Sequence, residues 1–421
     1  MKILIVAPNA SARFGGEAFL PLKYFEGLAR RGHAVRLVTH ARVRDELAAT
    51  FPDLMDRIDW VQDTRAHRVS VAAAGRLPGR LRDVVLGLTV GPLTDAAARR
   101  LIAARVAAGE VEVIHQPQPV SPRAPSAIHG FGVPVVIGPM NGDMRFPRGW
   151  EAREPALSRR LTPLLRLAAT VSNRLVPGKA RAAVLLVAND RTRRALPVAH
   201  PNVETLVENG VDFRTFAPCP LVPRAPGDPF RLVFLGRLVG WKAVDVTLAA
   251  LAQARAAGVP AELDILGDGE ARAALQAQAA PLGAAVRFHG FVPQAQAAAV
   301  LAQSHALILN SLWECGGAVV LEAMATGLPV IASAWGGPAD YLDASCGILV
   351  DPAPAASFAD RLAQAIARLA ADPAAAAAMG AAGAARARAE FDWDRKIDRI
   401  EAVYARALRQ AGRSSGTPSA G

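Results

Sequence analysis

The chain has 421 residues, enough for two or three domains of roughly 150 residues each, and 52% of them are hydrophobic. This composition excludes a collagen-like or largely disordered protein. The 48 basic residues outnumber the 37 acidic residues, giving a formal net charge of +11 at pH 7. Aromatic residues make up only 5% of the chain and no arginine cluster alternates with them, so nucleic acid is not an expected partner.

The N-terminal segment and the cysteines indicate a cytoplasmic protein. The apolar run at residues 3–7 is too short for the hydrophobic region of a signal peptide, and no apolar run is long enough to span a bilayer. Cys219, Cys315 and Cys346 lack metal-ligand spacing and are expected to be reduced thiols. We therefore expect a cytoplasmic location, with a peripheral position at the inner face of the membrane as the alternative.

Apolar runs separated by helix-length segments predict an open α/β sheet in the first half of the chain. The helix expected at residues 17–31 ends at Gly32. Continuous apolar runs are typical of parallel strands buried on both faces, connected by right-handed βαβ units. The predicted strands are residues 3–7, 34–39, 111–114 and 134–137.

The same alternation returns after residues 213–229, a stretch with five prolines that we interpret as a linker. The strands predicted there are residues 232–235, 261–266, 286–289, 306–310, 330–332 and 348–350. We therefore predict an α/β protein with two Rossmann-like domains, residues 1–212 and 213–392, facing each other across a cleft. A final helix at residues 395–408 is expected to pack back on the first domain, and residues 411–421 are expected to be disordered.

A glycine-rich turn followed by a predicted helix carries two carboxylates, Glu314 and Glu322. The turn contains Gly316 and Gly317. The backbone N–H groups of Gly317 and Ala318 are expected at the helix N-terminus, where they could bind an anion or sugar hydroxyls. Both glutamates are expected beyond the carboxyl ends of the strands, where α/β sheets bind ligands.

Two cations belong to the first strand–helix unit of the second domain. Arg237 follows the strand and Lys242 precedes the helix, so the two could neutralise a leaving diphosphate without a metal. Asp245 is interpreted as a helix N-cap. The Asp-x-Asp sequence at residues 392–394 precedes the last helix and is also interpreted as a cap, so no metal ion is expected.

Candidate residues of the first domain follow its predicted strands. Gly15 and Gly16 lie in the loop after the first strand, where glycine lets backbone amides approach phosphate oxygens. His115 ends the third predicted strand. Asn141 and Asp143 follow the fourth and could line the acceptor side of the cleft.

Residues 314–330 resemble the Glu–seven residues–Glu motif of the family 4 retaining glycosyltransferases, which have the GT-B fold. Residues 321–330 match its Leu-Glu-Ala-Met-Ala-x-Gly-x-Pro-Val pattern, whereas Gly316 stands where the family usually has Phe. Residues 234–245 are similar to the family's Gly-Arg-Leu and Lys-Gly-x-Asp segment.

The resemblance implies a retaining transfer of a sugar from a UDP- or GDP-linked donor to an unidentified glycan, lipid-linked or small-molecule acceptor. It implies that Glu322 holds the ribose and Glu314 the donor sugar. The backbone of Val292 would contact the base, and Arg237 and Lys242 would stabilise the leaving diphosphate.

In the first domain, the resemblance implies that Gly15 and Gly16 face the donor diphosphate and that His115 lies near the donor sugar or the acceptor. No carboxylate is placed as a nucleophile, which favours front-side attack assisted by the leaving phosphate, with no metal.

Two alternatives remain open, a nucleotide-sugar epimerase or hydrolase on the same fold and a non-catalytic nucleotide-sugar-binding module. A nicotinamide-dependent dehydrogenase is poorly supported, because Pro8 follows the first strand and the Gly-x-Gly-x-x-Gly turn is missing.

Residues 154–175 combine leucines at helical spacing with arginines, and residues 145–194 contain twelve basic and three acidic residues. Such a helix could contact an anionic membrane or hold a lipid-phosphate acceptor. It could equally pack its apolar side on the domain core, which is the interpretation we favour. Pro163 predicts a kink or a break in it. The arginines that would contact the membrane are Arg159, Arg160 and Arg166.

Overall fold

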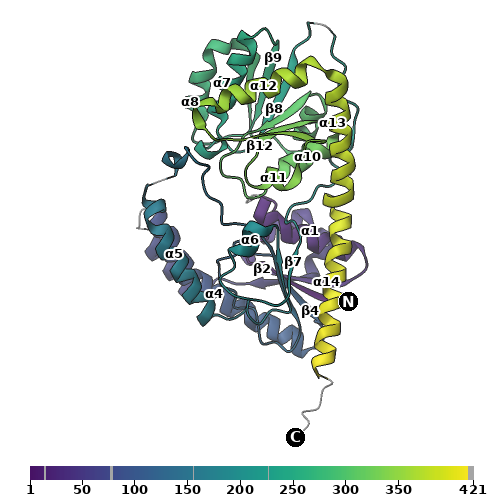
Figure 1. Ribbon diagram of the computed structural model, residues 1–421. Helices are drawn as coiled ribbons and strands as arrows, with labels where there is room; N and C mark the ends of the chain where they lie inside the picture. The colour runs from purple at the N-terminus through teal and green to yellow at the C-terminus, as the bar shows by residue number, and fades with distance from the viewer. Residues whose placement is uncertain (14–15, 76–78, 155, 226, 416–421) are drawn as a thin grey trace. The chain divides into compact units, whose positions relative to one another are not determined.

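The computed structural model describes residues 1–13, 16–75, 79–154, 156–225 and 227–415 (Figure 1). The chain forms two compact units. The first unit comprises residues 1–143, 163–208 and 397–421, and the second comprises residues 144–162 and 209–396. Residues 144–162 thus group with the second unit, whereas the sequence predicts a first domain that contains them, residues 1–212.

The first unit contains a seven-stranded parallel sheet with the order β3-β2-β1-β4-β5-β6-β7. The chain leaves β1 toward β2 and β3 and later returns to the other side of β1 with β4. The sheet therefore has a switch point between β1 and β4. The strands are β1 (Lys2–Val6), β2 (Ala34–His40), β3 (Ile58–Val61), β4 (Val113–Gln116), β5 (Val135–Met140), β6 (Val184–Val187) and β7 (Val203–Thr205).

The second unit repeats this plan in a six-stranded parallel sheet with the order β10-β9-β8-β11-β12-β13. Its switch point lies between β8 and β11. Two parallel sheets of this order confirm the predicted α/β class and its Rossmann-like character. The strands are β8 (Phe230–Leu235), β9 (Ala261–Leu266), β10 (Val286–Gly290), β11 (Ala306–Leu309), β12 (Val330–Ser333) and β13 (Gly347–Val350).

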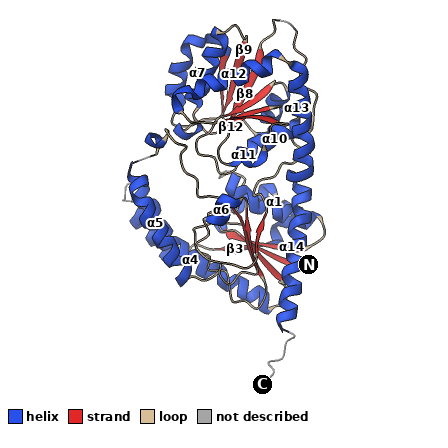
Figure 2. Cartoon of the chain, viewed as in Figure 1, coloured by secondary structure: helices blue, strands red, loops and turns tan. Residues whose placement is uncertain are grey.

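Helices cover the sheets in both units (Figure 2). Those up to residue 208 are α1 (Gly16–Arg30), α2 (Arg44–Thr50), α3 (Arg65–Ala74), α4 (Gly79–Ala107), α5 (Ala156–Leu175) and α6 (Asp190–Arg194). Those that follow are α7 (Val244–Ala256), α8 (Arg272–Ala279), α9 (Gln294–Ala302), α10 (Ala318–Thr326), α11 (Gly337–Tyr341), α12 (Phe358–Ala371), α13 (Pro373–Arg386) and α14 (Trp393–Ser415).

The apolar runs predicted as strands form the cores. In β1, four consecutive side chains from Ile3 to Val6 are fully buried, as expected for a central parallel strand covered on both faces. Leu4 and Val6 belong to one cluster with Ile114 of β4 and Ile137 of β5. Burial of these aliphatic side chains holds the carboxyl ends of the strands in place.

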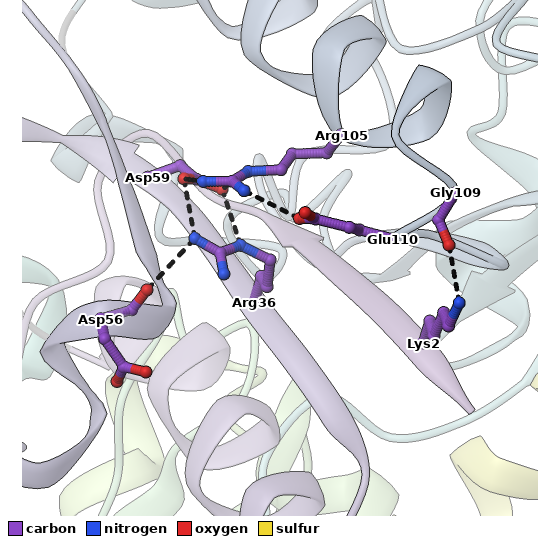
Figure 3. Close-up of polar contacts among 7 residues, drawn as sticks. All are labelled: Lys2, Arg36, Asp56, Asp59, Arg105, Gly109 and Glu110. Atoms are coloured by element: carbon purple, nitrogen blue, oxygen red, sulfur yellow. Dashed lines mark hydrogen bonds and ion pairs between the residues drawn. The ribbon is translucent and has the colours of Figure 1, made fainter.

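An ion-pair network joins β2, β3 and α4 (Figure 3). Asp59 of β3 accepts hydrogen bonds from Arg36 and Arg105, with both Nε–Oδ2 distances at 3.1 Å. Burial opposes ionisation of Asp59, but these arginines keep its pKa below the usual value. Arg105 also pairs with Glu110 at 2.8 Å. Because Asp59 and Arg36 stand near the amino ends of their strands, we assign the network to stability.

The last helix is longer than predicted. α14 runs from Trp393 to Ser415, so residues 411–415, predicted to be disordered, are helical, while residues 416–421 lie outside the described residues. From residue 397 onward the helix belongs to the first unit, where Glu401 pairs with Arg31 at 3.0 Å and with His33 at 2.8 Å.

Candidate active site

The predicted cations and the carboxylate Glu314 lie in the loops that follow β8 and β11, the two strands at the switch point of the second unit. Arg237 lies two residues beyond β8, and Glu314 lies in the loop that follows β11, its neighbour in the sheet. Ligands of open α/β sheets bind in the crevice outside the carboxyl ends of such a strand pair. The sheet order therefore places these residues where a nucleotide would bind.

Two hydrogen bonds fix the loop after β8 against the loop after β11. The backbone N–H of Leu312 donates to the carbonyl of Trp241 at 2.8 Å. The fully buried amide of Asn310 donates to the carbonyl of Ala243 at 2.9 Å and accepts from the hydroxyl of Thr247. These contacts, which the sequence analysis missed, set the position of the residue between Trp241 and Ala243.

That residue is Lys242, and its ammonium group forms an ion pair with Glu314. The two side chains are only 14% and 15% exposed. Ser311 contributes a hydroxyl 3.4 Å from the same carboxylate oxygen. The structure thus brings together two predicted catalytic residues that are 72 positions apart. Arg237 is exposed, with its guanidinium carbon 5.7 Å from the ring centroid of Trp241, within the range of a cation–π interaction.

Backbone strain also marks this region. Among the described residues, only Asp143 and Ala243 are non-glycine residues with positive φ, at 58° and 52°. For a residue with a Cβ atom this conformation costs energy, and such strain tends to occur at functional sites. Ala243 stands where the related motif has glycine, directly after Lys242.

The N-terminus of α10 has no side-chain cap. Its N-cap residue, Gly317, has φ 87° and provides no side-chain hydrogen bond to the helix. Ala318 is the first helical residue. The backbone N–H of Gly337 donates to the carbonyl of Glu314 at 2.8 Å, which fixes the turn that contains Gly316.

Glu322 lies within α10, and burial raises its pKa to about 7. A hydrogen bond with Gln294, the first residue of α9, opposes this shift. Gln294 follows the Val292 loop by two residues, so the predicted base-contacting loop and the predicted ribose ligand are joined by this hydrogen bond. No sequence signal distinguished Gln294 from other polar residues at the start of a helix.

In the first unit, His115 does not occupy the position predicted for a catalytic residue. It lies within β4 and is fully buried, with its Nε2 2.7 Å from the carbonyl of Gly138 and its Nδ1 2.7 Å from the hydroxyl of Tyr404. Burial lowers its pKa to about 4. Since both ring nitrogens are engaged and the ring is inaccessible, the structure argues against the catalytic role and indicates a structural one.

The predicted acceptor-side residues are also engaged in contacts within the first unit. The amide nitrogen of Asn141 donates to Glu208 at 2.7 Å, and its side chain is almost completely buried. Asp143 accepts hydrogen bonds from Arg123 at 2.8 Å and from Arg166 at 3.1 Å. These bonds indicate a structural role for Asn141, and they pair the carboxylate of Asp143 with two arginines.

Of the two predicted phosphate-binding glycines, the structure describes only Gly16. Gly16 is the exposed first residue of α1, a helix of 15 residues. Gly15 lies outside the described residues.

Asp245 is not the N-cap of α7, because Ala243 occupies that position. Its carboxylate pairs instead with Arg153, at 3.0 Å from Oδ1. Trp150, which like Arg153 lies in residues 144–162, donates from its indole to the carbonyl of Pro352 at 2.8 Å. These contacts explain why residues 144–162 group with the second unit.

The described part of the chain holds no cluster of three His, Cys, Asp or Glu residues suited to a metal ion. None of the helices in that part combines the length and apolar character needed to cross a bilayer.

Comparison with known proteins identifies the second unit. The family model for glycosyl transferases group 1 matches residues 222–386. D-inositol 3-phosphate glycosyltransferase of Mycolicibacterium paratuberculosis is 35% identical over 239 residues, covering 53% of this chain and 52% of that protein. A GDP-mannose-dependent monoacylated alpha-(1-6)-phosphatidylinositol monomannoside mannosyltransferase of Corynebacterium glutamicum is 30% identical over 218 residues, covering 48% of this chain and 56% of that protein. The chain thus spans about half the length of the curated relatives it matches.

Solved structures extend the likeness of the fold over nearly the whole chain. Anabaena HepE, solved in complex with UDP, covers 96% of this chain and 100% of its own with a TM-score of 0.66, at 17% sequence identity. The matched residues 222–386 contain both cations and both glutamates of the site. The model for glycosyl transferases group 1 therefore matches the second unit of this chain, and the fold of the chain is GT-B.

Proposed function

We propose that this chain is a retaining glycosyltransferase that moves a sugar from a UDP- or GDP-linked donor to a glycan, lipid-linked or small-molecule acceptor. The observation that carries the proposal is the Lys242–Glu314 pair at the β8–β11 switch point. The match of the second unit to the family model supports it, as do the GDP-mannose dependence of one relative and the UDP bound to a structural neighbour. The three cysteines, all in described parts of the chain, form no disulfide, which supports a cytoplasmic location.

Each predicted site residue of the second unit has a role in this proposal. Glu322 accepts hydrogen bonds from the ribose, and the backbone of Val292 contacts the base. Glu314 exchanges the ammonium of Lys242 for hydroxyl groups of the donor sugar. The released ammonium then binds the diphosphate together with Arg237. The turn at Gly316 and Gly317 and the amide of Ala318 bind the sugar or phosphate oxygens at the α10 N-terminus.

Charge develops on the diphosphate as the glycosidic bond breaks. Lys242 and Arg237 stabilise that charge. In other reactions with a phosphate leaving group, a divalent metal ion plays this role. Because Glu314 binds hydroxyl groups of the donor sugar, no carboxylate is assigned as a nucleophile, and the acceptor attacks from the side of the leaving phosphate. Gly15 and Gly16 are retained as predicted donor-binding residues, and His115 is not.

A panel of UDP- and GDP-sugars tested by thermal shift identifies the donor, because a ligand that binds the folded state raises the melting temperature. The donor found is then incubated with and without candidate acceptors. Transfer to an acceptor supports the proposal. Donor epimerisation or hydrolysis with every acceptor tested would favour the epimerase or hydrolase, and binding with no turnover would favour a binding module.

Sugar transfer is expected to continue in the presence of EDTA, because two protein cations supply the positive charge at the diphosphate. The measurement compares initial rates with chelator, without chelator and after addition of Mg²⁺ or Mn²⁺. Complete loss of turnover in chelator that either ion restores would contradict the metal-free mechanism.

Donor affinity is expected to rise with pH up to about 7 and to remain constant above it. Glu322 has a pKa of about 7 in the free protein, and ribose hydroxyls donate to its ionised form, so binding lowers that pKa. Below pH 7 the affinity should then fall by up to about tenfold per pH unit, since the carboxylate must lose a proton to bind. Calorimetry with a nucleotide sugar checks this, because a diphosphate diester does not titrate near neutrality.

The matched variant is Glu322→Gln, which keeps the shape of the side chain without its ionisation. It should bind the donor more weakly, with no dependence on pH between about 5.5 and 8. An unchanged pH dependence in this variant would assign the titration to another group.

A further inference from the structure

Helix α5 exposes its apolar side chains to solvent. The exposed fractions are 63% for Leu164, 59% for Leu165, 63% for Leu167, 45% for Val171 and 77% for Leu175. We call these five residues the α5 apolar face. Its exposure overturns the favoured sequence interpretation, in which this side of the helix packs on the core. The helix also runs through Pro163 without the break considered there.

Polar contacts fix the opposite side of α5. The side chain of Asn173 is buried, and its amide donates to the carbonyl of Arg123 at 2.9 Å. Arg166 donates to Asp143 at 3.1 Å. Asn173 and Arg166 are seven residues apart, about two helical turns, and therefore lie on one side. Leu164 is nine residues from Asn173, which places it about half a turn around the helix. The anchoring thus turns the apolar face outward.

The positive charge of α5 indicates which kind of partner binds the α5 apolar face. Residues 156–175 include four arginines and no aspartate or glutamate. Arg159 and Arg174 are exposed, whereas Arg166 is paired with Asp143. A second copy of the same helix would bring arginines against arginines. A bilayer with anionic headgroups offers an apolar boundary for the leucines and phosphates for the arginines.

We propose that α5 docks in the plane of an anionic lipid bilayer. The α5 apolar face enters the boundary between headgroups and acyl chains, and Arg174 contacts the headgroup phosphates. This is peripheral attachment by one face of a helix. The proposal does not depend on the proposed function, since it requires neither a donor nor turnover.

The test is flotation of the full chain with vesicles of phosphatidylcholine that contain about one-third phosphatidylglycerol, compared with phosphatidylcholine alone. The wild-type chain should float with the anionic vesicles and much less with the neutral ones. Arg174→Gln should weaken binding about fivefold, which corresponds to about 1 kcal/mol for an arginine near an anionic surface. Arg159→Gln should weaken it less, because Arg159 lies seven residues before Arg166, on the anchored side of the helix.

The double variant Leu164→Ser and Leu175→Ser keeps all the charges and separates insertion from simple attraction. It should reduce vesicle binding at least tenfold, because each buried leucine contributes well over one decade. Its melting temperature should match that of the wild type, because both side chains are exposed in the folded protein. Val69→Ser is the matched control, since Val69 is 68% exposed on α3, outside the proposed surface, and its loss should leave flotation unchanged.

Three results would overturn the proposal. The first is no flotation of the wild-type chain with anionic vesicles. The second is a large fall in the melting temperature of the double leucine variant, which would show that the α5 apolar face packs on the protein core. The third is a concentration-dependent dimer that the leucine changes dissociate in a chain that does not bind vesicles, which would identify a second copy as the partner.

Discussion

Replacing Lys242 or Arg237 by alanine is expected to slow sugar transfer by about two to three orders of magnitude while changing the affinity for the free nucleoside little. The loss of one positioned donor at a developing negative charge typically costs this much in rate. The nucleoside itself contacts neither cation in the proposed arrangement. The measurement is kcat with saturating donor, together with the nucleoside Kd from calorimetry.

The ion pair with Glu314 complicates the Lys242 variant, because alanine also leaves that carboxylate without its cation. The comparison is therefore repeated in a Glu314→Gln background. If Lys242 acts on the leaving group, Lys242→Ala still slows the reaction there. If Lys242 only orients Glu314, the second substitution has no further effect.

Arg368→Ala is the control for loss of a cation, since Arg368 is exposed on α12 and has no assigned role. Its rate should equal that of the wild type. Near wild-type turnover in both Lys242→Ala and Arg237→Ala would end the assignment of the diphosphate site.

Replacing Gly337 by alanine is expected to destabilise the second unit by about 3 kcal/mol and to weaken donor binding at least tenfold. An added Cβ would lie 1.9 Å from the carbonyl oxygen of Gly316 and 2.6 Å from that of Cys315. Both are backbone atoms, so the chain itself must move. The displaced turn carries Glu314 and leads into α10, and therefore folding and binding should suffer together.

Gly240→Ala provides the matched control in the same unit. No atom lies within 4 Å of a Cβ added there. For a unit of this size about 3 kcal/mol corresponds to roughly 6–12 °C, well resolved by thermal denaturation. Equal melting temperatures for the two variants would contradict the predicted overlap at Gly337.

The strands that form apolar runs could be predicted from the sequence, except β6, which was missed although its four residues are apolar and buried. β3 was missed because Asp59 interrupts its apolar pattern, and the partners of Asp59, Arg36 and Arg105, are 23 and 46 positions away. β7 was missed because three residues, Val-Glu-Thr, carry no pattern. Such strands are defined by their neighbours in the sheet, which local sequence does not show.

The site could be predicted in its parts but not in its contacts. Motif resemblance identified Lys242 and Glu314, yet only the sheet order brings them together. His115 looked functional beside a strand end, because nothing local shows that Tyr404, 289 positions later, contacts its ring. The leucine spacing of α5 revealed an apolar face, and the spacing of a helix says nothing about what that face contacts.

The discontinuity of the first unit has a consequence for synthesis on the ribosome. All but 19 residues of the second unit lie between residues 208 and 397, and the helix that buries Tyr404 against His115 comes after them. At about 5–20 residues per second, translation of that stretch takes about 10 to 40 s. The amino-terminal sheet therefore emerges first and waits, with the Tyr404 side of β4 uncovered, until α14 has left the ribosome.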